Sequence, residues 1–187
     1  MTIQNINSNL SLAILGHMSM RPLSGYSVQK LFRTTAWKAF GSSPGAIYPA
    51  LRRLEAVGFI RGTVEKKNSL RPRKVYVLTE KGREVLVKYV SQPVTREDII
   101  WRLDSISLRF AFMDKLLGED RILGFLQELQ TQMETYLKTL IDENKGLEKD
   151  MPFGGWAAFQ LGLESIKTYI RWARKTHEKL NHRKRAE

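Results

Sequence analysis

The stretch that decides the fold is residues 43–82, which read SPGAIYPALRRLEAVGFIRGTVEKKNSLRPRKVYVLTEKG. Ser43 is a good helix cap, and Pro44 suits the first helical position, where a backbone N–H is not needed. Two β-rich runs follow at about 59–65 and 74–78, joined by a basic turn. A helix, a strand, a basic turn and a second strand in this order predict a winged helix-turn-helix, a fold that lays one helix in the major groove of DNA.

Further helices are expected on both sides of this stretch. One covers about residues 8–20, a second begins at Ser24 and runs toward Trp37, and a third runs from Thr79 to about Val90. These helices supply the core against which the recognition helix packs.

The predicted recognition helix has two faces. Ile47, Leu51 and Leu54 recur at helical spacing and form its buried stripe. Tyr48 and Arg52 are one turn apart and point away from that stripe, and an arginine there can donate two hydrogen bonds to guanine or one to phosphate. The alternatives are a solvated surface charge for Arg52 and packing beneath the wing for Tyr48. The residues expected to bind DNA lie on this face, in the basic turn and at the start of the strand after it: Ser43, Gly45, Tyr48, Arg52, Lys66, Lys67, Arg71, Arg73 and Lys74.

The charge is concentrated in the same half of the chain. The sequence has 31 Lys and Arg against 19 Asp and Glu, a net charge of +12. Residues 1–90 contain 15 basic and 4 acidic side chains, whereas residues 91–187 contain 16 and 15. A basic domain attracts phosphate whatever the base sequence, although a generally soluble basic surface has the same composition.

Other kinds of site find little support. The chain has no cysteine, which excludes disulfides and thiolate metal sites. His17, His177 and His182 lack the spacing of a metal site, and the G-x-S-x-G pattern at 41–45 lacks the preceding strand that a nucleophile elbow requires. We therefore expect no enzyme activity, no cofactor and no metal. The absence of a run of roughly 20 apolar residues favours a cytoplasmic protein without a membrane span.

The chain is predicted to contain two domains, with a DNA-binding domain at 1–91 and a helical domain at 98–187. The first helix of the second domain is expected at about 98–117, and the tail at 182–185 is expected to be frayed and solvated. Two longer helices carry apolar residues at alternating spacings of three and four, which is typical of a coiled-coil seam. Two antiparallel helices of one chain can cover each other's seam, but a helix-turn-helix usually needs two half-sites, which favours a dimer. The residues expected at the dimer contact are Leu126, Leu129, Met133, Tyr136, Leu140, Phe159, Leu163, Ile166 and Ile170.

Aromatic residues are frequent in the second half. Core packing accounts for most of them, but a small aromatic or lipophilic effector is a further expectation. Its candidate binding residues are Trp101, Phe110, Trp156 and Trp172.

Three segments of the first half resemble the PadR family of transcriptional regulators: LAILGHMSMRPLSGYSVQKLF at 12–32, SPGAIYPALRRLEAVGFI at 43–60, and RPRKVYVLTEKGREVL at 71–86. The second half is similar in layout to the longer helical C-terminal domain of the subgroup that includes the phenolic-acid repressors. His17 departs from the apolar residue usual in the first helix.

The resemblance implies a homodimer that binds a roughly palindromic operator in double-stranded DNA, with much of the dimer contact in the C-terminal helices. It also implies a repressor released by a small hydrophobic or aromatic ligand. The resemblance implies the same DNA-binding positions as those named above, except Gly45. An activator of the same fold, a nonspecific architectural DNA-binding protein and a protein–protein adaptor are the alternatives.

Overall fold

The computed structural model describes residues 8–65 and 72–186. They divide into two compact units, which are described separately below. Of the described residues, the first unit contains 8–65, 72–92 and 107–116, and the second contains 93–106 and 117–186.

The first unit is a three-helix core with a small sheet and a fourth helix. Its elements in chain order are α1 (Asn9–Met20), β1 (Leu23–Ser24), α2 (Gly25–Thr34), the 3₁₀ helix η2 (Ala36–Phe40), α3 (Pro44–Ala56), β2 (Ile60–Glu65), β3 (Arg73–Leu78) and α4 (Glu80–Val90). The predicted caps at Ser24, Ser43 and Thr79 are confirmed, because each side chain accepts a backbone N–H from the first turn of its helix. The helix expected to run from Ser24 toward Trp37 ends earlier, and η2 continues the segment.

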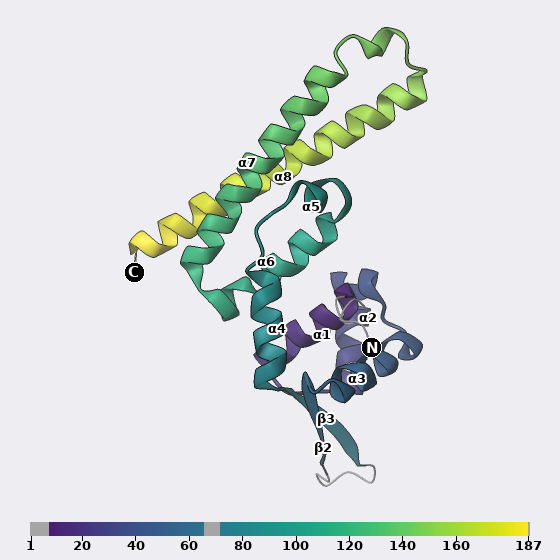
Figure 1. The fold of residues 1–187 in the computed structure, drawn as a ribbon, viewed down its shortest axis with the longest axis vertical. Coiled ribbons are helices and arrows are strands. Elements are labelled where there is room, and N and C mark those ends of the chain that lie inside the picture. The colour runs from purple at the N-terminus through teal and green to yellow at the C-terminus, as the bar shows by residue number, and fades with distance from the viewer. Residues whose placement is uncertain (1–7, 66–71, 187) are drawn as a thin grey trace. The chain divides into compact units, whose positions relative to one another are not determined.

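The sheet is antiparallel with strand order β1-β3-β2. Strands β2 and β3 pair from Ile60 opposite Leu78 to Glu65 opposite Arg73, and they extend together as the wing (Figure 1). The two-residue strand β1 was not expected from the sequence and pairs Leu23 with Tyr76. Residues 66–71 lie outside the described residues, and with them the predicted DNA contacts Lys66, Lys67 and Arg71.

An aromatic cluster joins the start of the first unit to α6 (Leu103–Leu117). Phe112 of α6 stacks on Trp37 at 5.5 Å between ring centroids, and His17 of α1 meets both rings edge-on. The helix expected over about 98–117 is therefore wrong in its bounds. It is two helices, α5 (Arg96–Trp101) and α6, separated at Arg102, and residues 107–116 belong to the first unit.

The second unit is built on a long antiparallel helical hairpin of α7 (Glu119–Glu143) and α8 (Phe153–Ala186), connected through the 3₁₀ helix η3 (Leu147–Lys149) (Figure 1). Helix α5 packs against α7. The predicted 4-3 seams face each other within this hairpin. Six of the nine residues expected at a dimer contact are already buried in the single chain, namely Leu126, Leu129, Met133, Leu163, Ile166 and Ile170, while Tyr136, Leu140 and Phe159 are half-buried. The in-chain pairing of the seams, one of the two arrangements left open by the sequence, thus accounts for their burial.

Ion pairs between the two long helices reinforce this antiparallel register. Arg174 pairs with Glu134 at 3.2 Å, and near the chain end Arg183 and Lys184 pair with Glu119 and Asp120. The expectation that the tail at 182–185 is frayed is therefore wrong, since α8 continues to Ala186, whereas the expectation that it is solvated is confirmed, since these residues are exposed.

Two negative findings concern the described residues only. No helix among them is long and apolar enough to cross a membrane. They also contain no group of three or more His, Cys, Asp or Glu side chains placed to hold a metal ion.

Candidate nucleic-acid interface

Helix α3 presents a polar face at the surface of the first unit. Ser43 Oγ accepts the Ala46 N–H at 3.2 Å and so begins the helix, while Ile47 and Leu51 are fully buried on its inner side. The candidate DNA-binding residues of this helix are exposed on the other side: Ser43, Gly45, Tyr48 and Arg52. The geometry therefore matches the two faces predicted from the sequence.

Tyr48 is placed by contact with α2. A Cβ atom built on Gly25 would come within 2.6 Å of Tyr48 Cε1, so the tyrosine ring rests on the backbone where α2 begins. The Tyr48 side chain nevertheless remains 39% exposed. The contact at Cε1 fixes the outer part of the ring, while the exposed remainder of the side chain is open to a ligand.

A groove of about 810 Å³ lies between α2, α3 and the sheet. Its walls combine hydroxyls, phenol rings and cations, a mixture suited to a sugar–phosphate backbone. The lining residues include Arg21, Ser24, Tyr26, Ser27, Lys30, Thr34, Tyr48, Arg73, Lys74 and Tyr76. We call this feature the α2–α3 groove.

Tyr26 and Lys30 are candidate contacts that the sequence analysis missed. Tyr26 is 68% exposed, although tyrosine usually buries much of its ring, and Lys30 lies one turn further along the same face of α2. A signal was present in the sequence, since Val28 and Phe32 mark the inner side of this helix and leave Tyr26 and Lys30 outside it.

The two basic residues of strand β3, Arg73 and Lys74, have acidic partners. Arg73 pairs with Glu65 across the hairpin at 3.1 Å and is 58% exposed. Lys74 Nζ lies 2.7 Å from Glu55 Oε2, and this hydrogen bond raises the pKa of the Lys74 ammonium above its ordinary value. Arg73 is therefore the more accessible of the two cations.

The four candidate effector residues do not gather at one place within the second unit. Trp101 in α5 is 81% exposed, whereas Trp156 in α8 lies beside Phe159 at 5.6 Å between ring centroids. Trp172 stands on the opposite side of α8, about 24 Å further along the helix. One small ligand cannot touch both tryptophans of α8 in a single chain. Phe110, in α6, belongs to the first unit.

These features define the class of the protein. A helix with exposed tyrosine and arginine, supported by two other helices and followed by a basic β-hairpin, is a winged helix-turn-helix.

The comparisons with known proteins agree with that class. The family model described as "Transcriptional regulator PadR-like family" matches residues 14–88. The curated protein "Negative transcriptional regulator PadR" of Bacillus subtilis (strain 168) is 24% identical over 168 residues, which cover 87% of this chain and 92% of the relative. Residues 14–88 are therefore similar to the PadR-like family, which is a family of transcriptional regulators and not of enzymes.

Solved structures of Bacillus subtilis PadR give similar figures. PadR in complex with operator DNA is 23% identical, with coverage of 90% of this chain and 97% of that chain and a TM-score of 0.40. PadR in complex with p-coumaric acid is 23% identical, with coverage of 92% and 99% and a TM-score of 0.39.

Proposed function

We propose that this protein is a sequence-specific DNA-binding repressor that acts as a homodimer on a palindromic operator. The observation that carries the proposal is the exposed face of α3, where Tyr48 and Arg52 stand one turn apart beside the α2–α3 groove. In this arrangement α3 enters the major groove, and Arg52 reads a base edge. Ser43 and the backbone around Gly45, at the positive end of the helix dipole, contact a phosphate.

The wing and α2 grip the backbone on either side of α3. Arg73 is exposed on β3, and Lys30 and Tyr26 line the groove from α2. Lys66, Lys67 and Arg71, outside the described residues, belong to the same proposed wing contact. This division assigns specificity to α3 and most of the salt-dependent affinity to the flanking cations.

Fluorescence anisotropy with the protein's own upstream DNA and with a random duplex, each at two salt concentrations, tests the proposal. We expect the upstream DNA to bind roughly 10³-fold more tightly, as is usual for a specific regulator. Arg52→Ala reduces that preference, whereas Arg53→Ala, which removes the same charge about 100° around the helix, leaves it. Equal binding of both duplexes supports the nonspecific architectural alternative, and no binding of either contradicts the DNA-binding role.

The direction of regulation needs a separate measurement. A reporter behind the bound upstream DNA is expected to fall in activity when the protein is present and to recover with Arg52→Ala. A rise in reporter activity identifies an activator of the same fold.

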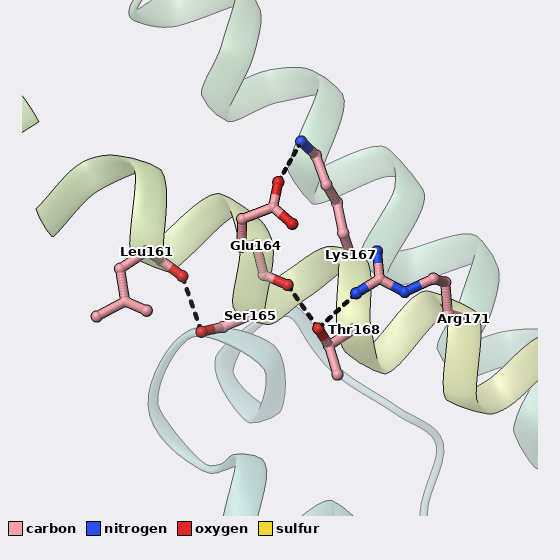
Figure 2. Close-up of polar contacts among 6 residues, drawn as sticks. All are labelled: Leu161, Glu164, Ser165, Lys167, Thr168 and Arg171. Carbon is pink, nitrogen blue, oxygen red and sulfur yellow. Dashed lines mark hydrogen bonds and ion pairs between the residues drawn. The ribbon is translucent and has the colours of Figure 1, made fainter. Parts of the chain in front are cut away.

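The dimer is supported by the outer side of α8, which lies opposite the in-chain seam. A stripe along that side carries no charged residue, and Leu161 at its middle is 70% exposed. Glu164 and Arg171 flank this stripe, and the Arg171 guanidinium donates to the Thr168 hydroxyl at 2.8 Å. The residues of the stripe are Gly154, Ala157, Leu161, Ser165, Thr168 and Trp172. Figure 2 shows that the Ser165 and Thr168 hydroxyls on this side donate to carbonyl oxygens of their own helix, each at 2.8 Å. The stripe thus offers a largely apolar surface in the half of the chain where 16 basic and 15 acidic residues nearly balance, so a second copy meets little electrostatic repulsion there.

The cysteine-free sequence permits a clean test of this surface. We expect Ser165→Cys in the full chain to cross-link to a second copy with a short thiol reagent. Thr131→Cys, on the outer side of α7, is the matched control and should stay uncross-linked. A sedimentation mass of 21.6 kDa for the unmodified chain at micromolar concentration contradicts the dimer.

Release by a small aromatic effector is the last part of the proposal. The exposed indole of Trp101 is the observation that supports such a ligand in the second unit. The Bacillus subtilis protein was solved with p-coumaric acid, and that compound is the first to test. Release of bound operator DNA and quenching of tryptophan fluorescence are expected with this acid or a related one. A panel of aromatic acids that changes neither signal contradicts effector control by this class of ligand.

A further inference from the structure

Glu55 connects the recognition helix to both strands of the wing. It is the last residue but one of α3, and its carboxylate has two partners on two strands. Oε1 accepts the Gly62 N–H of β2 at 3.2 Å, and Oε2 accepts from Lys74 Nζ of β3 at 2.7 Å. The two contacts hold the wing against the C-terminal end of α3, the helix proposed to read DNA.

The strand pairing brings the groups of this contact to one face of the sheet. Gly62 pairs with Tyr76 and Val64 with Lys74, so all four residues point to the same face of the hairpin. A Cβ atom on Gly62 would come within 2.2 Å of Lys74 Cε and 2.8 Å of Glu55 Oε1. The missing side chain at Gly62 is therefore the space through which Lys74 reaches Glu55.

Two further features favour a fixed contact over an incidental surface pair. Strand β2 is at the edge of the sheet, and the Glu55 carboxylate binds a backbone N–H of that edge. The ammonium of Lys74 also lies over the ring of Tyr76, 5.3 Å from its centroid, and Tyr76 is only 6% exposed. Exposed ion pairs contribute little by themselves, but this one is tied to a backbone group and a buried ring.

We propose that Glu55 is a positioning residue that sets the angle of the wing relative to α3, with Lys74 as its counter-ion and not as a DNA contact. This inference rests on the proposed DNA-binding function. Lys74 thus helps to position the wing, while Arg73, Lys30 and the basic turn neutralise the phosphates. The affinity for DNA therefore depends on the angle between α3 and the wing, because both must contact the duplex at once.

A double-mutant cycle of Glu55→Gln and Lys74→Met in the full chain tests the assignment. The amide oxygen that Glu55→Gln introduces still accepts the Gly62 N–H, so the fold is expected to survive, which a thermal melt verifies. Each single variant lowers affinity for operator DNA by roughly tenfold, the double variant is no worse than either, and the slope of affinity against salt stays the same. Glu84→Gln, an exposed carboxylate on α4, is the control for the change in net charge and leaves affinity within about twofold.

A direct phosphate contact by Lys74 gives a different pattern. Lys74→Met then lowers the salt slope by about one, while Glu55→Gln leaves operator binding unchanged or strengthens it. That result overturns the proposal. A further readout needs no DNA: the amide proton of Gly62 should shift in NMR in Glu55→Ala, which removes the hydrogen-bond acceptor, and should not do so in Glu84→Gln. A chain that shows this shift but binds no DNA contradicts the proposed function and leaves the contact intact, whereas the absence of the shift contradicts the contact itself.

Discussion

The ring of Tyr48 lies against the backbone of Gly25, and this contact joins the two helices of the helix-turn-helix. Since a Cβ on Gly25 would approach Tyr48 Cε1 to 2.6 Å, the position of the tyrosine depends on a glycine 23 residues earlier. Gly25 and Tyr48 therefore have to be considered together as one part of the candidate interface.

Gly25→Ala is expected to displace the Tyr48 ring and to weaken operator binding by roughly the same factor as Tyr48→Ala. The overpacking costs about 1–3 kcal/mol of stability, which urea unfolding measures. Gly124→Ala is the control, since a Cβ there meets open space on α7 and should stabilise the helix by roughly 0.5–1 kcal/mol. Undiminished DNA affinity in Gly25→Ala would show that the contact does not orient Tyr48 for binding.

Lys30 is predicted to neutralise a phosphate from the α2–α3 groove. Lys30→Ala should weaken binding to operator and random duplex by similar factors, because a phosphate contact carries no sequence information. The slope of affinity against salt should fall by about one. Lys88→Ala, on α4 outside the groove, should change neither quantity. A loss confined to the operator would assign Lys30 to base recognition.

His17 makes the stability of the first unit dependent on pH. Burial, with a smaller contribution from the nearby Arg21, lowers its pKa from 6.5 to about 4. Around the imidazole are the rings of Phe32, Trp37 and Phe112. The imidazole is therefore protonated below about pH 6.5 in the unfolded chain, but only below about pH 4 in the folded chain. The free energy of unfolding falls as pH drops through that window.

Urea unfolding at pH 7, 5.5 and 4.5 measures this effect. From pH 7 to pH 4.5, we expect the unmodified chain to lose about 2 kcal/mol more of its free energy of unfolding than His17→Leu loses. This value is smaller than the whole pKa shift would give, because the ring is only partly buried. At pH 7 the variant should be at least as stable, since Nε2 of His17 is buried without a hydrogen-bond partner among the described residues. His182→Gln, an exposed histidine of α8, should leave the pH dependence unaltered. If the free energy of unfolding changed equally with pH in His17→Leu and in the unmodified chain, His17 would not be the source of the pH dependence.

The elements of the winged helix were predictable because their signals are local. Ser43 and Thr79 cap their helices through contacts within three residues, and the stripe of α3 needs only its own periodicity. The pairing of Lys74 with Glu55 was not predictable in this way. A run of basic residues reveals cation density, but the partner lies 19 positions earlier in the chain.

Periodicity also left the partner of each buried face undetermined. The spacing of Leu163 and Ile166 predicts a buried seam equally well for an in-chain hairpin and for a dimer, and the structure places that seam against α7. In the same way, the apolar pattern around Phe112 predicts a helix with a buried side. It does not reveal that the ring packs on Trp37 in the first unit.

The packing of Phe112 against α1 gives the sharpest stability prediction. A Cβ on Gly16 would lie 2.3 Å from Phe112 Cε2, so Gly16→Ala must push the ring away from His17 and Trp37. We expect a loss of about 2–3 kcal/mol in a site that is fully packed. Phe112→Leu alone should cost a comparable amount, because it removes ring contacts and leaves a cavity.

The double variant distinguishes a steric clash from a general intolerance of change at residue 16. A leucine side chain at position 112 leaves space for the new methyl group, so Gly16→Ala should cost less in the Phe112→Leu background than in the unmodified chain. The coupling between the two substitutions is expected to reach about 1 kcal/mol or more, the range found for residues in direct contact. Additive losses in urea unfolding would mean that Phe112 does not occupy the space over Gly16. In that case residues 107–116 would not be packed on α1, and the first unit would end at residue 92.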